Sequence, residues 1–364
     1  MIFYWLFFLL LSALAFIETR RLAYPNGYIN PSLNPLWWFF ILILSIFIGL
    51  RHQVGGDWGS YKIYFDLMAY QDLSQIFDVN HDMGYAGLNW LVNVIGYDIY
   101  LVNLVCGSIF AFGLCYLCRN LPRPFLALCV SFPYLITVVS MGYTRQSVAI
   151  GLSMIAIVAL TKQKLFRFSL LIIIAALFHK TALILFGLAF LAASRNRLMI
   201  LIALLIFVYV GYLSFLSESF GLLFQYYVLN DYQSEGAFIR VSMLLLPSLI
   251  LLIWPHRFEF NTYQKNLWMW CARISVILFL LLIFTSASTA VDRLALYFLP
   301  IQMVIFSYLP EILYKRHEIN HLIVSMVIMF YGFVQFVWLN FATFSIYWLP
   351  YDNYLLSGLS LIHI

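Results

Sequence analysis

The sequence predicts an all-α, polytopic membrane protein that forms one integral membrane domain over residues 1–364. Hydrophobic residues make up 64% of the chain and charged residues only 10%, whereas soluble domains carry about 25% charged residues. The mean hydropathy is +0.93. Apolar runs recur along the whole chain. Because a spanning helix needs roughly 20 apolar residues, we expect about 12 transmembrane helices.

Short polar or basic segments separate the apolar runs, and each run is interpreted as one span. The predicted spans cover residues 3–17, 36–50, 99–117, 125–139, 147–160, 168–178, 181–193, 198–216, 241–254, 267–284, 294–309 and 322–339. The first run lacks the basic start and cleavage site of a signal peptide, so it is interpreted as a retained span. A short helix in the membrane interface is expected over 85–91.

The distribution of lysine and arginine predicts how the spans are oriented. When alternate connections are counted, fourteen of the 20 basic residues fall on one face and six on the other. Cytoplasmic loops carry the excess of basic residues, so we expect both termini to be extracytoplasmic. The larger extracytoplasmic segments are then 51–98 and 217–240. The six outer basic residues are Arg51, Lys62, Arg145, Lys180, Arg240 and Arg293.

Charge pattern and motifs argue against several classes of function. The net charge of +5 comes from basic residues scattered singly between apolar runs, which does not indicate a nucleic-acid partner. Cys115 and Cys118 have no second pair or histidine cluster that would complete a zinc site. The stretch from Asp78 to Asp82 departs from a calcium loop, and no Walker loop, GxSxG or HExxH occurs. We expect no metal and no other cofactor.

Five of the outer cations share a position at the end of an apolar run: Arg51, Arg145, Lys180, Arg240 and Arg293. Ionisable residues at membrane depth are costly and often functional. If these side chains converge, they form a basic pocket suited to a lipid-borne phosphate, because arginine matches phosphate oxygens in bidentate fashion. The alternative is that each cation pairs locally or extends to the surface, as Arg293 could pair with Asp292.

Two residues near these cations are candidates for acid–base chemistry. Asp57 follows Arg51 by six residues in a glycine-containing loop, where its carboxylate could accept a proton from a hydroxyl group. Its alternative role is an ion pair with Arg51 or solvation of the loop. His179 lies between two predicted helices, and histidine is the usual acid or base near neutral pH. The alternative for His179 is a hydrogen bond to the backbone, and the sequence alone does not choose between the two candidates.

Four short motifs carry a family resemblance. They are Arg51-x-x-Val54-Gly55-x-Asp57-x-x-x-Tyr61, Arg145-Gln146-x-x-Ala149, Phe178-His179-x-x-Ala182 and Asp292-Arg293-x-x-x-Tyr297. In this order, and with the predicted topology, they resemble the EpsG-type family of Wzy-like polymerases of bacterial surface polysaccharides, which include O-antigen, capsule and exopolysaccharide. The resemblance covers nearly the whole chain. Gly56 is one departure, since a small polar residue is expected there.

The resemblance implies a glycosyltransferase that joins oligosaccharide repeat units carried on undecaprenyl diphosphate, at the outer face of the bacterial inner membrane. Pre-placed cations stabilise the charge on the departing diphosphate without a metal, and a base assists the acceptor hydroxyl. The residues expected to bind the diphosphate are Arg51, Arg145, Lys180, Arg240 and Arg293. The candidate bases are Asp57 and His179, and the expected supporting residues are Gln146, Asp292, Trp58 and Tyr61.

Other roles and partners remain open. Trp58, Tyr226, Tyr227 and Tyr232 are candidates for stacking on sugar rings, or alternatively residues of an interfacial belt. A flippase for the lipid-linked oligosaccharide would need polar residues deep within the spans, whereas the ionisable residues here cluster at helix ends. A membrane acyltransferase acting on glycans would need a stronger histidine signature. The expected partners are the undecaprenyl-diphosphate-linked oligosaccharide and membrane lipid, and a chain-length regulator protein is a further possible partner.

Overall fold

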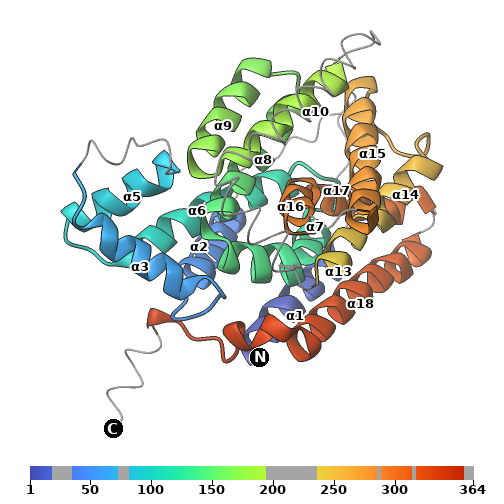
Figure 1. Cartoon of the computed structure of the whole chain (residues 1–364). Coiled ribbons are helices and arrows are strands. Elements are labelled where there is room, and N and C mark those ends of the chain that lie inside the picture. Colours follow the sequence, from blue (N-terminus) through green and yellow to red (C-terminus); the bar gives the residue numbers. More distant parts are fainter. Residues whose placement is uncertain (19–34, 73–81, 194–235, 285–287, 314–316, 356–364) are drawn as a thin grey trace.

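The computed structural model of the chain describes residues 1–18, 35–72, 82–193, 236–284, 288–313 and 317–355 (Figure 1). All named elements in these ranges are helices, which confirms the predicted all-α class. The predicted span 198–216 and the candidate sugar-stacking residues Tyr226, Tyr227 and Tyr232 lie outside the described residues.

Each predicted span within the described ranges corresponds to one helix or to two or three successive helices. These are α1 (Ile2–Ile17), α2 (Pro35–Gly49), α6 (Ile99–Cys118), α7 (Pro124–Ser131) with η1 (Phe132–Ser140), α8 (Thr144–Thr161), α9 (Leu165–Phe178), η2 (Lys180–Leu183) with α10 (Ile184–Ala193), α13 (Ala237–Ser242) with α14 (Leu245–Ile253), α15 (Thr262–Phe284), α16 (Ser288–Ala295) with η4 (Leu296–Phe298) and α17 (Pro300–Leu313), and α18 (His317–Phe341).

The length and hydropathy of the described helices support a membrane protein, but with fewer clear spanning helices than the sequence predicted. Of the described helices, four are long and apolar enough to cross a membrane: α6, α8, α15 and the 320–341 part of α18. A fifth results if α16–η4 and α17, bent by 46°, form one span. The remaining apolar helices have 10–17 residues, fewer than the roughly 20 that span a bilayer. The predicted 12 spans and the orientation of the termini therefore stay predictions.

Glycines let three helices pack closely at the centre of the molecule. Helix α6 packs against both α2 and α8. A Cβ atom on Gly113 of α6 would collide with the backbone of Gly151 on α8, and one on Gly49 of α2 would collide with that of Leu104 on α6. Small residues permit such close contact between membrane helices. As a result, the end of α2 lies beside the beginning of α8.

The helix that leads to α8 changes its winding. Helix α7 continues without a break into η1, a π-helix of nine residues. π-helical segments are rare and frequently occur at functional sites. The carbonyl of Thr137 in η1 accepts a hydrogen bond of 2.8 Å from the Trp348 indole. Because η1 ends at Ser140, its altered winding sets the direction of the turn that precedes α8.

The polar stretch after α2 contains two helices where the sequence predicted one. Helix α3 (Trp58–Met68) was not predicted, and α5 (Met83–Val94) corresponds to the helix expected over 85–91. The two pack together and lie at one side of the molecule, coloured blue and cyan (Figure 1). Helix α5 also packs on α9, where a Cβ on Gly84 would lie 3.0 Å from the carbonyl oxygen of Leu177. This close approach places the start of α5 near His179.

A C-terminal strap, residues 343–355 including η5 (Thr343–Trp348), holds the loop that follows α2. Arg51 and Asn353 form an isolated antiparallel bridge. The amide of Gly55 donates a 2.8 Å hydrogen bond to the Tyr347 carbonyl, and the amide of Tyr354 donates one of 2.8 Å to Leu50. The first motif of the chain is thus fixed by the C-terminal strap.

Candidate active site

Arg51 is a buried tether between two helices. Its side chain is 1% exposed. The guanidinium donates from Nη1 to the Ile48 carbonyl at 2.7 Å, from Nε to the Val54 carbonyl at 3.1 Å and from Nη2 to the Thr144 hydroxyl at 2.8 Å. The Trp58 ring lies 5.7 Å from the guanidinium carbon. Each guanidinium nitrogen therefore already has a protein partner, and Arg51 joins the end of α2 to the first residue of α8.

Arg145 follows that residue directly and lies in a different environment. Its Nη1 forms a single ion-pair contact of 2.9 Å with Asp82 Oδ2, and the two side chains are 42% and 4% exposed. The guanidinium also interacts with the hydroxyl of Tyr61 on α3. Asp82 and Tyr61 therefore hold Arg145 on its buried side, while a large part of the Arg145 side chain remains exposed.

Arg240 is held by two contacts and not one. Its Nε and Nη2 donate to the two carboxylate oxygens of Asp292 at 2.8 and 2.6 Å, and the side chains are 15% and 6% exposed. Such bidentate pairs are geometrically specific, and this one ties α13 to α16. The local alternative considered for Arg293, an ion pair with its neighbour Asp292, is not what the structure contains, because Asp292 pairs with Arg240.

Arg293 is the exposed arginine of the group. The amide of Gln146 donates a 2.8 Å hydrogen bond to the Arg293 carbonyl. This bond connects the start of α8 to α16 and fixes the backbone from which the guanidinium projects. Among the described residues, no hydrogen bond or ion pair occupies the Arg293 side chain, which instead acts electrostatically on Asp57 and His179.

The positive charges of Arg145 and Arg293 act on both Asp57 and His179. Burial raises the pKa of the Asp57 carboxyl, and the two guanidinium groups oppose this increase. Burial, together with the charges of the same two arginines, lowers the pKa of His179 to about 3. The Nε2 atom of His179 is buried without a hydrogen-bond partner among the described residues. At neutral pH the His179 imidazole is thus uncharged.

Lys180, the fifth predicted phosphate ligand, is the residue after His179 and begins η2. It is partly buried. The next residue, Thr181, donates a 3.0 Å hydrogen bond to the buried Tyr297 hydroxyl. This contact attaches the α9–α10 break to η4, and therefore His179 and Lys180 are carried on a connection anchored beside α16.

The structure thus brings together Arg145, Arg293, Asp57, Asp82 and His179, which we call the site cluster. Asp82 was not predicted for it, since the sequence offered this residue only as part of an incomplete calcium loop. Its one usable signal is its position directly before an interfacial helix, where acids favour the N-terminus. Within the described ranges, no group of three His, Cys, Asp or Glu side chains is placed to hold a metal ion.

Comparison with known proteins adds one finding. No curated protein and no solved structure matches this chain. The model of the EpsG family matches residues 35–353, an interval that contains every residue of the site cluster and most of the C-terminal strap. Because the match covers most of the chain, this protein belongs to the EpsG family.

Proposed function

We propose that this protein polymerises oligosaccharide repeat units carried on undecaprenyl diphosphate, at the extracytoplasmic face of the bacterial inner membrane. Membership of the EpsG family indicates a membrane protein with a polysaccharide polymerase-like function. The lipid carrier, the repeat unit and the membrane face are the steps added by the proposal. The observation that carries it is the site cluster, in which two arginines act on one carboxylate and one neutral histidine.

Arg145 and Arg293 are proposed to bind the diphosphate. Their guanidinium groups are half exposed and exposed, and neither is enclosed by a bidentate carboxylate. Guanidinium groups match phosphate oxygens well. As the glycosyl bond to the diphosphate breaks, the leaving oxygen takes the electron pair, and cations already in place stabilise its charge without reorganisation. Lys180, carried next to His179, is proposed to add a third cation at this position.

Arg51 and Arg240 are proposed to hold this site in shape and not to contact the diphosphate. All three guanidinium nitrogens of the buried Arg51 donate to protein atoms, and Nε and Nη2 of Arg240 donate to the Asp292 carboxylate. Arg51 holds Thr144, the residue that precedes Arg145. Arg240 holds Asp292, the residue that precedes Arg293. The two scaffold arginines therefore position the two ligand arginines, and Gln146 connects both halves.

Asp57 is proposed as the base. The acceptor hydroxyl attacks the anomeric carbon of the growing glycan, and its proton passes to the Asp57 carboxylate while the diphosphate leaves. A raised pKa makes Asp57 a stronger base than an ordinary carboxylate, whereas a pKa of about 3 makes His179 a weak one. His179 is proposed to hydrogen-bond the substrate through Nε2, which is buried without a partner among the described residues.

Deleting the protein from its native cell tests this function. The proposal expects the surface-glycan ladder to collapse to single repeat units on the lipid carrier. Long polymer in the deletion strain, with no redundant enzyme, would show that the protein is not the polymerase. A third result, loss of lipid-linked glycan from the outer leaflet, would identify a flippase instead.

A further inference from the structure

Four aromatic rings gather beside the site, and we call them the aromatic cluster: His52, Trp58, Tyr100 and Tyr354. They come from the loop after α2, the start of α3, the start of α6 and the C-terminal strap. Tyr100 is central, with ring centroids 4.2 Å from Tyr354, 5.7 Å from Trp58 and 5.9 Å from His52. Segments that are distant in sequence thus form one aromatic surface.

This surface is held in a fixed arrangement. The rings of His52 and Tyr354 are each stacked with Tyr100, at interplanar angles of 30° and 28°. His52 Nδ1 and the Tyr100 hydroxyl share a hydrogen bond, and the Tyr354 amide is bonded to Leu50. Tyr354 nevertheless remains 52% exposed. Stacking on Tyr100 therefore fixes the position of Tyr354, while much of Tyr354 remains exposed.

Carboxylates border the aromatic cluster. Asp98 and Asp352 both lie close enough to Tyr100 to interact with it electrostatically. Each uses Oδ1 to accept the amide of the residue that follows it, at 2.6 and 2.7 Å. The second oxygen of each carboxylate takes no part in those bonds and can accept a hydrogen bond from a ligand hydroxyl.

The combination of an open ring with nearby carboxylates fits a neutral sugar. The C–H face of a pyranose packs on an aromatic ring, while its hydroxyls donate to carboxylates. An interfacial aromatic belt is the simpler explanation for outer tyrosines. A belt residue acts singly, however, whereas Tyr354 is stacked in a four-ring assembly bordered by two acids. The buried Arg51 lies behind Trp58, so the surface offers an anion no exposed cation among these residues.

We propose that the aromatic cluster is a sugar-binding subsite, where Tyr354 stacks on a neutral pyranose of the glycan and Asp98 and Asp352 accept its hydroxyl groups. The inference rests on the proposed function, because it takes the glycan of a lipid-linked repeat unit as the ligand. Continuity with the site cluster supports it, since Trp58 belongs to the aromatic surface and follows Asp57 directly. Sugars bound here are held beside the proposed base.

The test measures the binding of sugar and of diphosphate separately, on the purified full-length protein in lipid nanodiscs. One probe is the repeat-unit oligosaccharide released by mild acid from the carrier lipid of the native cell, without lipid or phosphate. The other is undecaprenyl diphosphate without sugar. For Tyr354→Leu we expect oligosaccharide binding, measured by saturation-transfer NMR, to weaken about tenfold. Binding of undecaprenyl diphosphate should not change, and this also verifies that the variant is folded.

Two variants act as controls. Tyr354→Phe keeps the ring and should bind the oligosaccharide within about twofold of the wild type. Tyr97→Leu removes a tyrosine that is 64% exposed and makes no ring contact among the described residues, and it should leave both affinities unchanged. The subsite is refuted if the wild type does not bind the oligosaccharide, if Tyr354→Leu binds it normally, or if Tyr97→Leu has the same effect.

The outcome separates this inference from the proposed function. If Tyr354→Leu loses the oligosaccharide but the wild-type protein makes no polymer, the subsite stands and the polymerase assignment fails. If the wild type makes polymer and Tyr354→Leu binds sugar normally, the polymerase assignment stands and the subsite fails.

Discussion

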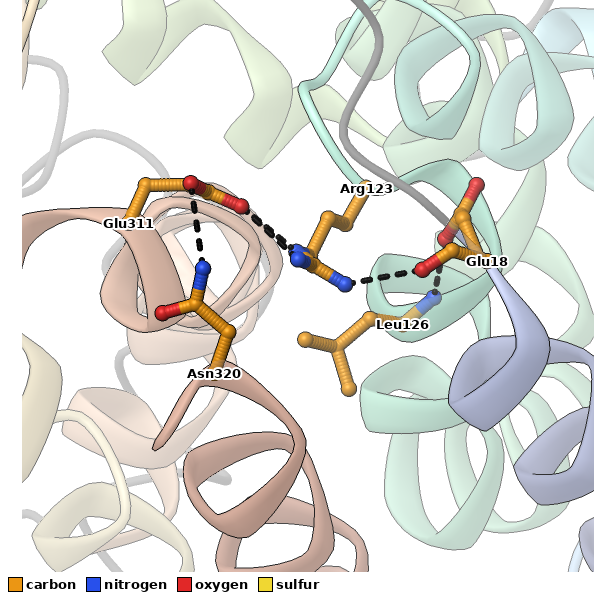
Figure 2. Close-up of polar contacts among 5 residues, drawn as sticks. All are labelled: Glu18, Arg123, Leu126, Glu311 and Asn320. Atoms are coloured by element: carbon orange, nitrogen blue, oxygen red, sulfur yellow. Dashed lines mark hydrogen bonds and ion pairs between the residues drawn. The ribbon is translucent and has the colours of Figure 1, made fainter. Parts of the chain in front are cut away.

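Two arginine-centred polar regions lie at opposite ends of the helix formed by α7 and η1, and they are built differently. Arg123 directly precedes α7 and belongs to the network of Glu18, Glu311 and Asn320 shown in Figure 2. The site cluster lies beyond the end of η1. The helix between the two regions has eight residues in α7 and nine in η1.

In the Arg123 network every guanidinium nitrogen is used. Nε and Nη2 donate to Glu311 at 3.1 and 2.7 Å, and Nη1 donates to the Glu18 carbonyl at 2.9 Å. The Glu18 carboxylate in turn accepts the Leu126 amide at the start of α7, as Figure 2 shows. Asn320 donates to the other oxygen of Glu311. The network joins α1, α7, α17 and α18 and is buried on the Arg123 side.

In the site cluster the pairing is incomplete. Arg145 has one carboxylate contact and remains half exposed, and Arg293 is anchored through its carbonyl and not through its guanidinium. A saturated buried ion pair can fix the positions of helices but has no donor left for a ligand. In this protein, therefore, the number of guanidinium donors that are already hydrogen-bonded to protein atoms distinguishes a scaffold arginine from a candidate ligand arginine. Arg51 resembles Arg123 by this measure, and Arg240 shares with both a guanidinium that is held by at least two donated hydrogen bonds.

The largest effect is expected from breaking the Arg123 network. Arg123→Met keeps the side-chain length but leaves Glu311 without its cation, and removing one partner of a buried pair costs about 3–5 kcal/mol. We expect a clear decrease in the thermal unfolding midpoint in detergent. An unfolding midpoint equal to that of the wild type would mean that the network does not stabilise the helices.

A comparable effect, on activity and not on stability, is expected at Arg293. Arg293→Ala removes an exposed cation that the proposal places on the leaving diphosphate, and the loss of one such group slows the reaction about 10²–10³-fold. The measurement is glycan extension on lipid-linked repeat units, with the unfolding midpoint as the control. Normal chain lengths would remove Arg293 from the diphosphate site.

A smaller effect is expected for the scaffold pair. Asp292→Asn replaces a charge-assisted bidentate contact with a neutral one and should lower the free energy of unfolding by about 1–3 kcal/mol. Extension should decrease less than in Arg293→Ala, because Arg293 itself remains. If Asp292→Asn folds normally and yet abolishes extension, Asp292 contacts the substrate and the scaffold assignment is wrong.

The smallest effect is expected in the pH dependence of extension. Because burial raises the pKa of Asp57, the ionised base is lost, and the rate falls, as pH decreases through a value above that of an ordinary aspartate. Arg293 opposes this shift, so Arg293→Gln should move the acidic limb of its residual rate to higher pH, and Arg293→Lys should not. A limb that is unchanged in Arg293→Gln would contradict the electrostatic effect of Arg293 on Asp57.

Much of the helical framework could be predicted from the sequence, because apolar runs bounded by charges define helices locally. Helix α3 was missed because Lys62 and Asp66 interrupt its apolar residues. Its packing on α5, which the sequence does not reveal, stabilises it. The motif residues Arg145, Arg293, Asp57 and His179 do converge in the structure. Asp82 could not be assigned, because its role depends on the close approach of α5 to α9 at Gly84.

The scaffold roles of Arg51 and Arg240 were also beyond the sequence. Both residues stand at the ends of apolar runs, as Arg145 and Arg293 do, and position along the chain does not reveal which donors are occupied. Arg51 is enclosed because the C-terminal strap, about 300 residues later in the chain, closes over its loop. Long-range contacts of this kind separate the two classes of arginine.

Extension by the purified protein alone tests the polymerase assignment most directly. The full-length chain is reconstituted in liposomes with repeat units on undecaprenyl diphosphate, and the products are resolved by length. We expect a ladder of glycans with the wild type, a similar ladder at a permissive temperature with Arg123→Met, and single units with Arg293→Ala. Single units with the folded wild-type protein would contradict the polymerase assignment, and equal ladders with wild type and Arg293→Ala would contradict the diphosphate site.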